Sequence, residues 1–235
     1  MRTKTSSGAC GSVLLALLLA FVPQAGASTG DEVDRCPVRL NDVYVRVNAG
    51  RIQSSPDGKF WTDRPVAIRT FMRGVTSGNG MLVAVGGSYV EPPGVIFTSR
   101  DGHNWVRRQM SDHPILYAVA YGRERFVAVG DGGVILVSTN GTRWQRQDSG
   151  TTALLATVAF GNELFVAGGE SGTVLVSTNG LIWKSCPLAS SHYIGSISFR
   201  NGSFAIRVPG ANLIAENARD WRTQESVMPE SLLAR

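Results

Sequence analysis

Apolar side chains recur along this chain in short runs of period two, and glycine, asparagine and aspartate separate the runs. Residues 116–147 show the pattern: "LYAVAYG", "RFVAVG", "VILVS" and "RWQRQ" are divided by "RE", "DGG" and "TNGT". Runs rich in Val, Ile, Phe and Tyr predict β-strands, and Asn-Gly or Asp-Gly between two runs predicts a tight antiparallel connection. The pattern therefore predicts four short antiparallel strands in each stretch of about 40 residues.

This four-strand unit is repeated. Residues 119–144, "VAYGRERFVAVGDGGVILVSTNGTRW", align without a gap with residues 158–183, "VAFGNELFVAGGESGTVLVSTNGLIW". All five tryptophans occupy one phase of the repeat, at spacings of 44, 39, 39 and 38 residues: Trp61, Trp105, Trp144, Trp183 and Trp221. Four strands in a unit of this length are typical of a propeller blade. We predict an all-β fold, a β-propeller of about five four-stranded antiparallel blades over residues 43–226.

The first unit is the least regular. "VYVRVNAGRIQSS" (43–55) matches the second half of a unit, so the first half would fall on the poorly matching "CPVRLND" (36–42). Its inner strand could come from residues 28–42, as an N-terminal segment or first strand. Alternatively "VMPESLLAR" (227–235), the C-terminal tail, could act as a closing strand, because many propellers hide their sheet edges by joining both chain ends in one blade.

Each unit also contains a turn of the form Ser-x-Asp/Asn-Gly-x-x-Trp, as in "SPDGKFW" (55–61) and "STNGTRW" (138–144), with a degenerate copy, "AENARDW" (215–221). A short side-chain acceptor can bond the amides of its own turn, and glycine supplies the unusual φ. The tryptophan is expected to start the outer strand and to donate its indole N–H to a carbonyl. Because Asn replaces Asp in two copies, we interpret these residues as turn acceptors rather than as catalytic or metal-binding groups.

The repeated turn resembles the Asp-box, or bacterial neuraminidase repeat, of sialidases, of other propeller-fold glycoside hydrolases and of photosystem II assembly and stability factors. The resemblance covers about residues 43–226 and implies a blade type, since these families differ in activity. A sialidase resemblance implies six blades and an Arg-Ile-Pro motif ahead of the first turn, whereas the nearest string here is "IRVPG" (206–210) in the last unit. The photosystem-factor resemblance implies a non-enzymatic scaffold, of seven blades, that binds another protein.

Candidate catalytic residues are sparse. Three histidines are isolated and have no metal-ligand spacing: His103, His113 and His192. "DGG" (131–133) predicts a hairpin turn rather than a phosphate loop, because no helical pattern follows it. Three glutamates fall in or beside turns and are expected to be solvated: Glu124, Glu163 and Glu170. We predict no catalytic, cofactor-binding or metal-binding residues, while Arg73 and Arg123 are candidates to face a central channel.

A binding function needs less than an enzyme does, because a propeller presents the turns of every blade on one face. The loop "YVEPPG" (89–94) differs most from its counterparts, and proline makes it stiff. We therefore expect a binding or scaffold module that recognises a protein or glycan partner through its blade-connecting loops. The alternative is a glycan-active glycoside hydrolase of sialidase-like propeller type, whose carboxylate pair would come from different blades.

The N-terminus predicts export. Residues 1–27 have a basic start, an apolar run and Ala25-Gly26-Ala27 as a cleavage site, which is typical of a secretory signal peptide. We expect a secreted or periplasmic protein with no membrane span in the mature chain. Cleavage lowers the formal net charge from +5 to +3 by removing Arg2 and Lys4, and the remaining arginines are scattered, so nucleic acid is not an expected partner.

Two cysteines, Cys36 and Cys186, remain after cleavage. An oxidising compartment would allow a bridge between them, but a disulfide needs Cα atoms within about 7 Å, which the inner and outer strands of different blades would rarely satisfy. The sequence leaves the bridge and the oligomeric state open.

Overall fold

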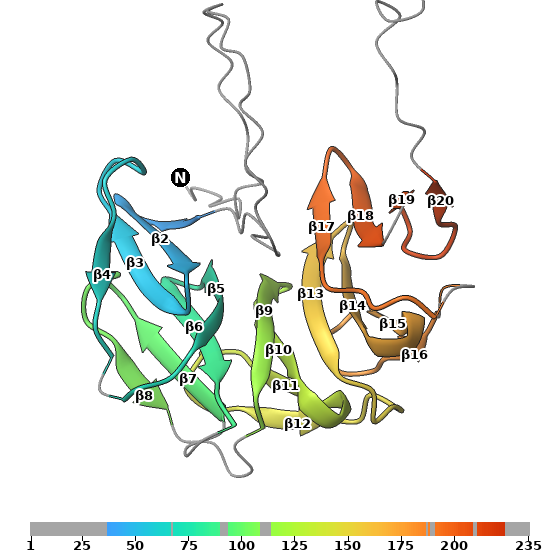
Figure 1. Cartoon of the computed structure of the whole chain (residues 1–235), viewed down its shortest axis with the longest axis horizontal. Coiled ribbons are helices and arrows are strands. Elements are labelled where there is room, and N and C mark those ends of the chain that lie inside the picture. The colour runs from blue at the N-terminus through green and yellow to red at the C-terminus, as the bar shows by residue number, and fades with distance from the viewer. Residues whose placement is uncertain are drawn as a thin grey trace, which may run out of the picture.

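The computed structural model of the protein describes residues 37–66, 68–89, 94–108, 114–186, 188, 191–208 and 211–223. Five four-stranded antiparallel sheets form the blades of a β-propeller, arranged along an arc with the first and last blades at its two ends (Figure 1). Sequential strands pair in every sheet, from the inner strand to the outer strand. The predicted fold and blade number are confirmed.

The blades follow one another along the chain. Blade 1 contains β1 (Val38–Leu40), β2 (Val43–Asn48), β3 (Arg51–Ser55) and β4 (Thr62–Arg64). Blade 2 contains β5 (Met72–Gly78), β6 (Met81–Gly87), β7 (Gly94–Ser99) and β8 (Val106–Arg108). Blade 3 contains β9 (Leu116–Gly122), β10 (Arg125–Gly130), the 3-10 turn η1 (Asp131–Gly133), β11 (Ile135–Ser138) and β12 (Gln145–Gln147). Blade 4 contains β13 (Leu155–Gly161), β14 (Leu164–Gly169), η2 (Glu170–Gly172), β15 (Val174–Ser177) and β16 (Lys184–Ser185). Blade 5 contains β17 (Ile197–Arg200), β18 (Ser203–Val208), β19 (Ala211–Ala215) and β20 (Arg222–Thr223).

Two details sharpen the predictions from the sequence. The inner strand of blade 1 is β1, which pairs with β2 through Leu40 and Val43, so the segment before residue 43 supplies it. Residues 227–235 lie outside the described part of the chain. The outer strands are also shorter than predicted, because β12 begins at Gln145, one residue after Trp144.

The hydrophobic core lies between the blades rather than within one central mass. One position of the second strand is fully buried in blades 2 to 5: Leu82, Phe126, Phe165 and Phe204. In blade 3 the ring of Phe126 lies 4.7 Å from that of Tyr121 and 6.4 Å from that of Trp144, between centroids. The tryptophan thus packs against the core that the phenylalanine fills.

Blades 2 to 5 also interlock through a glycine at the end of the inner strand of blades 2, 3 and 4. A Cβ placed on Gly78 would lie 2.1 Å from the ring of Tyr121 in the next blade. The same relation holds between Gly122 and Phe160, at 2.2 Å, and it recurs once more, between Gly161 and Phe199, at 2.1 Å. We call these three pairs the glycine–ring joints. Any side chain at these glycines would collide with the neighbouring blade.

Among the residues that the structure describes, no helix is long and apolar enough to cross a membrane. Cys186 is a free cysteine, and Cys36 lies outside the described residues.

Candidate functional site

The repeated turns lie between the third and fourth strands of blades 1 to 4, at residues 55–58, 99–102, 138–141 and 177–180, and we call them the Ser-Asx-Gly turns. In blade 3, Asn140 Oδ1 accepts the amides of Thr142 and Arg143 at 2.9 and 3.0 Å. Ser138 Oγ accepts the amide of Gly141 at 2.9 Å. The Trp144 indole donates to the Gly141 carbonyl at 3.0 Å, so the turn holds its tryptophan as well.

Aspartate makes the same bonds in blades 1 and 2. Asp101 Oδ1 accepts the amides of Asn104 and His103 at 2.8 and 2.9 Å. These amides and the Asn104 side chain hold the pKa of the Asp101 carboxyl well below its usual range. The two residue types therefore do one job as acceptors in the turn. The indole bond is less general, because Nε1 of Trp105 and of Trp221 has no hydrogen-bond partner among the described residues.

These turns also contact the preceding blade. A Cβ on Gly141 would lie 3.0 Å from both Met81 and Val83 of blade 2, and Asn79 Nδ2 donates to the Thr139 carbonyl at 3.4 Å. Two features of this position favour glycine: its φ of +70°, which other residues rarely adopt, and the close approach of blade 2. The end of the blades that carries these turns, which we call the turn end, is thus occupied by structural contacts.

The opposite end of the blades, where second and third strands connect, has a different construction. In blade 2, Met72 pairs with Gly86 and Gly74 pairs with Val85, so Arg73 is an extra residue in the inner strand. Blades 3 and 4 have the same irregularity, and their extra residues are Tyr117 and Ala156. A bulge of this kind re-aims one side chain and is common beside binding sites. We call this the bulge end.

Backbone contacts fix each bulge. In blade 3 the Asp131 amide donates to the Ile115 carbonyl at 3.0 Å, and a Cβ on Gly130 would lie 2.0 Å from that carbonyl oxygen. The equivalent bonds join Gly87 to Phe71 and Glu170 to Leu154, each at 3.0 Å. The frame of the bulge is therefore repeated, while the bulge residue itself changes from blade to blade.

The bulge residues of blades 2 and 3 contact each other. The Arg73 guanidinium lies 4.7 Å from the centroid of the Tyr117 ring, a cation–π contact. The Tyr117 hydroxyl lies 3.1 Å from that of Tyr89, whose side chain is 81% exposed. Burial, together with the Tyr89 hydroxyl and the nearby Asp131 carboxylate, raises the pKa of Tyr117, so it stays a neutral phenol. Among the described residues the buried Arg73 Nε has no hydrogen-bond partner.

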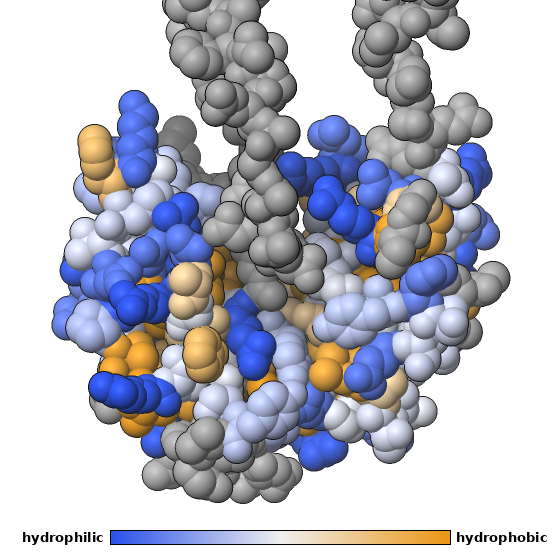
Figure 2. All heavy atoms as spheres, viewed as in Figure 1, coloured by the Kyte–Doolittle hydropathy of each residue, from blue (hydrophilic) through white to orange (hydrophobic). Residues whose placement is uncertain are grey.

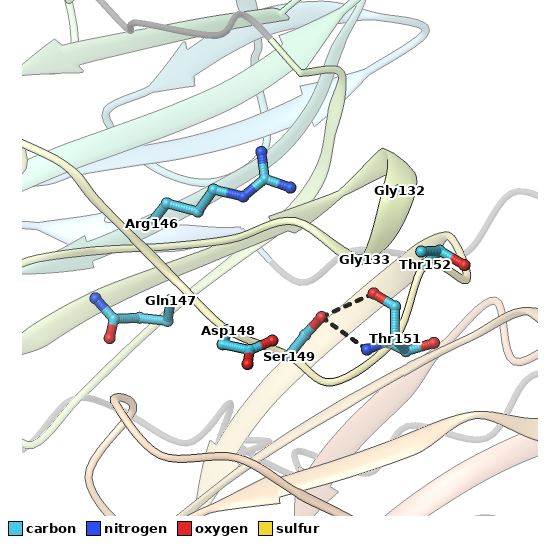
Figure 3. Close-up of a pocket in the computed structure, with 8 residues that line it drawn as sticks. All are labelled: Gly132, Gly133, Arg146, Gln147, Asp148, Ser149, Thr151 and Thr152. Atoms are coloured by element: carbon cyan, nitrogen blue, oxygen red, sulfur yellow. Dashed lines mark hydrogen bonds between the residues drawn. The ribbon is translucent and has the colours of Figure 1, made fainter.

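A polar pocket of about 420 Å³ lies beside η1 (Figure 3). Its lining comes from η1, from β12 and from the segment that leads to blade 4: Gly132, Gly133, Arg146, Gln147, Asp148, Ser149, Thr151 and Thr152. Ser149 Oγ donates to the Thr151 carbonyl at 3.1 Å, and Asp148 Oδ1 accepts the Gly150 amide at 2.9 Å. Several of its polar groups thus bond within the loop, which suits a connector better than a ligand site.

The structure describes two of the three histidines. His103 is exposed in its turn, with Nδ1 2.6 Å from the Asp101 carbonyl, and His113 lies outside the described residues. His192 is exposed, and its carbonyl accepts the Gly172 amide at 3.0 Å. No group of three His, Cys, Asp or Glu side chains suited to a metal ion occurs within the described part of the chain.

The two candidate arginines, Arg73 and Arg123, lie at opposite ends of the blades. Arg73 lies near the start of an inner strand, at the bulge end, whereas Arg123 follows the end of the next inner strand, at the turn end. Arg123 pairs there with Glu163 at 2.9 Å, in an exposed ion pair. Glu124 has a φ of +57° in the same hairpin turn as Arg123, and Glu170 Oε2 accepts the Leu154 amide at 3.2 Å.

Sequence reasoning pointed to Arg73 and to the loop that begins at Tyr89, and it missed Tyr117. The loop between Tyr89 and Gly94 lies outside the described residues. The available signal was that equivalent positions of the repeat hold Arg73, Tyr117 and Ala156, three unlike residues within otherwise similar strands.

Apolar surface does not mark a single site. On the face shown in Figure 2, hydrophobic residues form small patches that hydrophilic residues separate. Exposed large apolar side chains occur at both ends of the blades, for example Phe71 and Tyr193 at the bulge end and Phe60 and Ile182 at the turn end. Three arginine–aromatic stacks occur among the described residues, and the stack of Arg73 on Tyr117 is the one that joins two blades.

No protein-family model and no curated protein matches this chain. The structure of YCF48 bound to a D1 peptide aligns over 83% of this chain and 67% of that chain, at 17% identity and a TM-score of 0.59. The Niastella koreensis GH74 enzyme aligns over 77% and 29%, at 18% identity and 0.55. The WD40 propeller domain of Doa1 aligns over 82% and 68%, at 13% identity and 0.60. Similarity at these identities shows the fold alone.

Proposed function

We propose that this protein is a non-enzymatic propeller that binds another protein through its bulge end. The observation that carries the proposal is the stack of Arg73 on Tyr117, two bulge residues from adjacent blades. Both side chains are aimed by a backbone frame that the blades share, while the side chains differ. Shared frames with divergent side chains are how a repeat fold builds a specific binding surface.

The chemistry of this site suits recognition of a polypeptide. Arginine and tyrosine are enriched at binding hot spots, because each combines a large apolar area with hydrogen-bonding groups. Arg73 is only half-buried, so its guanidinium brings a positive charge and N–H donors to the site, and the exposed Tyr89 adds a second aromatic ring beside Tyr117. A partner that places an acceptor beside an apolar side chain would use both features.

Structural similarity supports the same class of function. YCF48, a propeller of similar fold, was solved with a bound peptide, and peptide binding at a propeller surface needs no catalytic group. We also interpret the Ser-Asx-Gly turns as Asp-boxes, which several propeller families with different activities share. The hydrolase alternative has less support, because Glu170 accepts an amide of its own blade and Asp131 lies against Tyr117.

Affinity capture tests this proposal. We expect the wild-type chain, used as bait in the extracellular or periplasmic fraction of its source organism, to retain a defined protein. The variant Arg73→Ala with Tyr117→Ala should lose that protein. Arg123→Ala, at the turn end, is the matched control and should retain it, since its ion pair is exposed. Equal capture by both variants would refute the site, and release of sugar from a glycan panel would favour the hydrolase.

Export is part of the proposal. The first 27 residues are interpreted as a signal peptide removed after Ala27, so N-terminal sequencing of the natural protein should begin at Ser28. An intact N-terminus in a cytoplasmic fraction would contradict this.

A further inference from the structure

The two faces of each blade can be compared position by position, because the strand registers are equivalent. We call the face toward the next blade in sequence the front face and the opposite one the back face. In blade 3 the front face consists of Val127, Val129, Ile135 and Val137, which all pack in one buried cluster with blade 4. In blade 4 the same positions hold Val166, Gly168, Val174 and Val176. The front faces of blades 3 and 4 are therefore apolar, and those of blades 1 and 2 differ only at one position, where the buried hydroxyls of Ser54 and Thr98 accept an arginine Nε.

The front face of blade 5 breaks this rule. Its four positions, found from the same strand pairing, are Ala205, Arg207, Asn212 and Ile214. Arg207 and Asn212 are exposed, whereas their counterparts Val129 and Ile135 in blade 3 are fully buried. An arginine and an asparagine here would have to lose their hydration if another blade docked, which is expensive without new partners.

The back face of blade 1 departs in the same way. Where blade 3 has Ala128 paired with Leu136, blade 1 has Arg46 paired with Gln53. Arg46 Nε donates to Gln53 Oε1 at 2.9 Å, and Gln53 Nε2 donates to Asp63 Oδ1 at 2.8 Å. This network covers the sheet where the other blades carry a hydrophobic core, so the face is already satisfied without a neighbour.

The joint positions also change at the two ends. In blade 4, Gly161 is the last residue of the inner strand and pairs with Leu164. In blade 5 the equivalent pair is Arg200 and Ser203, so an arginine occupies the glycine position. In blade 4, Phe160 pairs with Phe165 and supplies the ring of a glycine–ring joint. In blade 1 the equivalent pair is Arg39 and Tyr44, so an arginine occupies the ring position. The Arg39 guanidinium lies 5.2 Å from the Tyr44 ring centroid.

We propose that the front face of blade 5 and the back face of blade 1 are terminal faces. They remain solvated and accept no further blade, neither from the other end of the arc nor from a second copy of the chain. A joint between them would bring Arg39 against Arg200, two like charges in a position that packs a ring over a glycine at the three glycine–ring joints. Stacked repeat proteins need polar outer faces on their end units for the same reason.

This inference is tested by grafting residues of blade 4 onto the two terminal faces. The protein is expressed from its complete coding sequence and purified in the mature form that the cell produces. The back graft is Arg39→Phe, Arg46→Ala and Gln53→Leu, which copies Phe160, Ala167 and Leu175 of blade 4. The front graft is Arg200→Gly, Arg207→Gly and Asn212→Val, which copies Gly161, Gly168 and Val174. A joint needs both grafted faces, so each graft alone is a control for added apolar surface.

In sedimentation velocity we expect the wild type and each single graft to migrate with the mass of one chain. An equimolar mixture of the two grafts should migrate with the mass of two chains. The inference is overturned if the two folded grafts do not associate, or if the wild type associates and both grafts abolish that association. If a triple substitution unfolds the chain, as circular dichroism would show, the equivalent residues of blade 3 replace those of blade 4. The back graft is then Arg39→Tyr, Arg46→Ala and Gln53→Leu, and the front graft is Arg200→Gly, Arg207→Val and Asn212→Ile. Partner capture at the bulge end is a separate measurement and does not affect this outcome.

Discussion

The turn end and the bulge end of the blades follow opposite rules. At the turn end the side chains repeat, from Ser138 and Asn140 in blade 3 to Ser177 and Asn179 in blade 4, and they make the same bonds. At the bulge end the backbone bonds repeat but the extra residue does not. Sequence identity between repeats therefore marks positions that hold the fold, and we propose that differing residues within a repeated backbone frame mark positions for recognition.

The largest effect should come from a glycine–ring joint near the turn end. Gly122→Leu would place a side chain inside the Phe160 ring, since even a Cβ would lie 2.2 Å from it. We expect the free energy of unfolding to fall by about 3 kcal/mol, measured by urea denaturation. Blade 1 and blade 2 carry Leu40 and Ser77 at the equivalent positions, so adding Phe160→Ser should restore part of the loss. Additive losses in the double variant would contradict the joint.

How far the sequence predicts this molecule follows the same division. The spacing of five tryptophans and the Asn-Gly turns predicted the fold, because a repeated turn has a local cause that lies within a few residues. The Arg73–Tyr117 contact was not predictable in that way, because the two residues are 44 positions apart in the sequence. It also depends on β-bulges, for which the sequence contains no local motif. The bulge depends on a carbonyl bond across two strands, which only the register reveals.

The two terminal faces were partly predictable from the sequence. Arg200 stands where the alignment of the repeats has glycine, so its position was readable in the sequence, but its meaning was not. Only the contact of Gly161 with Phe199 in the next blade shows what an arginine at that position would prevent.

Removing a turn acceptor should have the next largest effect. Asn140→Ala leaves the amides of Thr142 and Arg143 without their bonds to Oδ1. We expect a loss of about 1–2 kcal/mol in the free energy of unfolding, read from the urea midpoint. Asn140→Asp is the matched control and should cost much less, because Asp57 and Asp101 make the same bonds. Equal losses would mean that the turn needs an amide group rather than an acceptor.

A change at the bulge end should disturb stability less. Arg73→Ala removes the contact with the Tyr117 ring, and such contacts contribute about 0.5–1 kcal/mol. We expect the free energy of unfolding to fall by no more than this contribution, as measured by urea denaturation. The variant should also lose partner capture. A loss of stability as large as that of Gly122→Leu would place Arg73 among the structural residues and remove the contrast between the two ends.

Repair of the degenerate turn in blade 5 should give a small gain. Asn217 Oδ1 still accepts the amides of Arg219 and Asp220 at 2.9 and 3.1 Å, but Ala215 replaces the serine. Ala215→Ser would supply the hydroxyl that accepts the glycine-position amide at 2.9 Å in blades 1 to 3. We expect a gain of about 0.5 kcal/mol in the free energy of unfolding. Ala211→Ser, on the same strand outside the turn, is the control and should give no gain.

The smallest effect at neutral pH should come from Asp101→Asn, which keeps the acceptor and removes the charge. The Asn104 side chain, which donates to the second carboxylate oxygen at 2.7 Å, can turn to offer its own oxygen instead. Since the folded protein lowers the pKa of Asp101 below 3.8, the ionised carboxylate contributes stability that is complete above this value and is lost as the pH falls below it. The urea midpoints of the two proteins should therefore agree at neutral pH, and in acid the wild type should lose more than the variant. Parallel curves at every pH would show that the charge of Asp101 plays no part in the turn, whereas a large loss in the variant at neutral pH would show that the first two turns, unlike the third and fourth, depend on it.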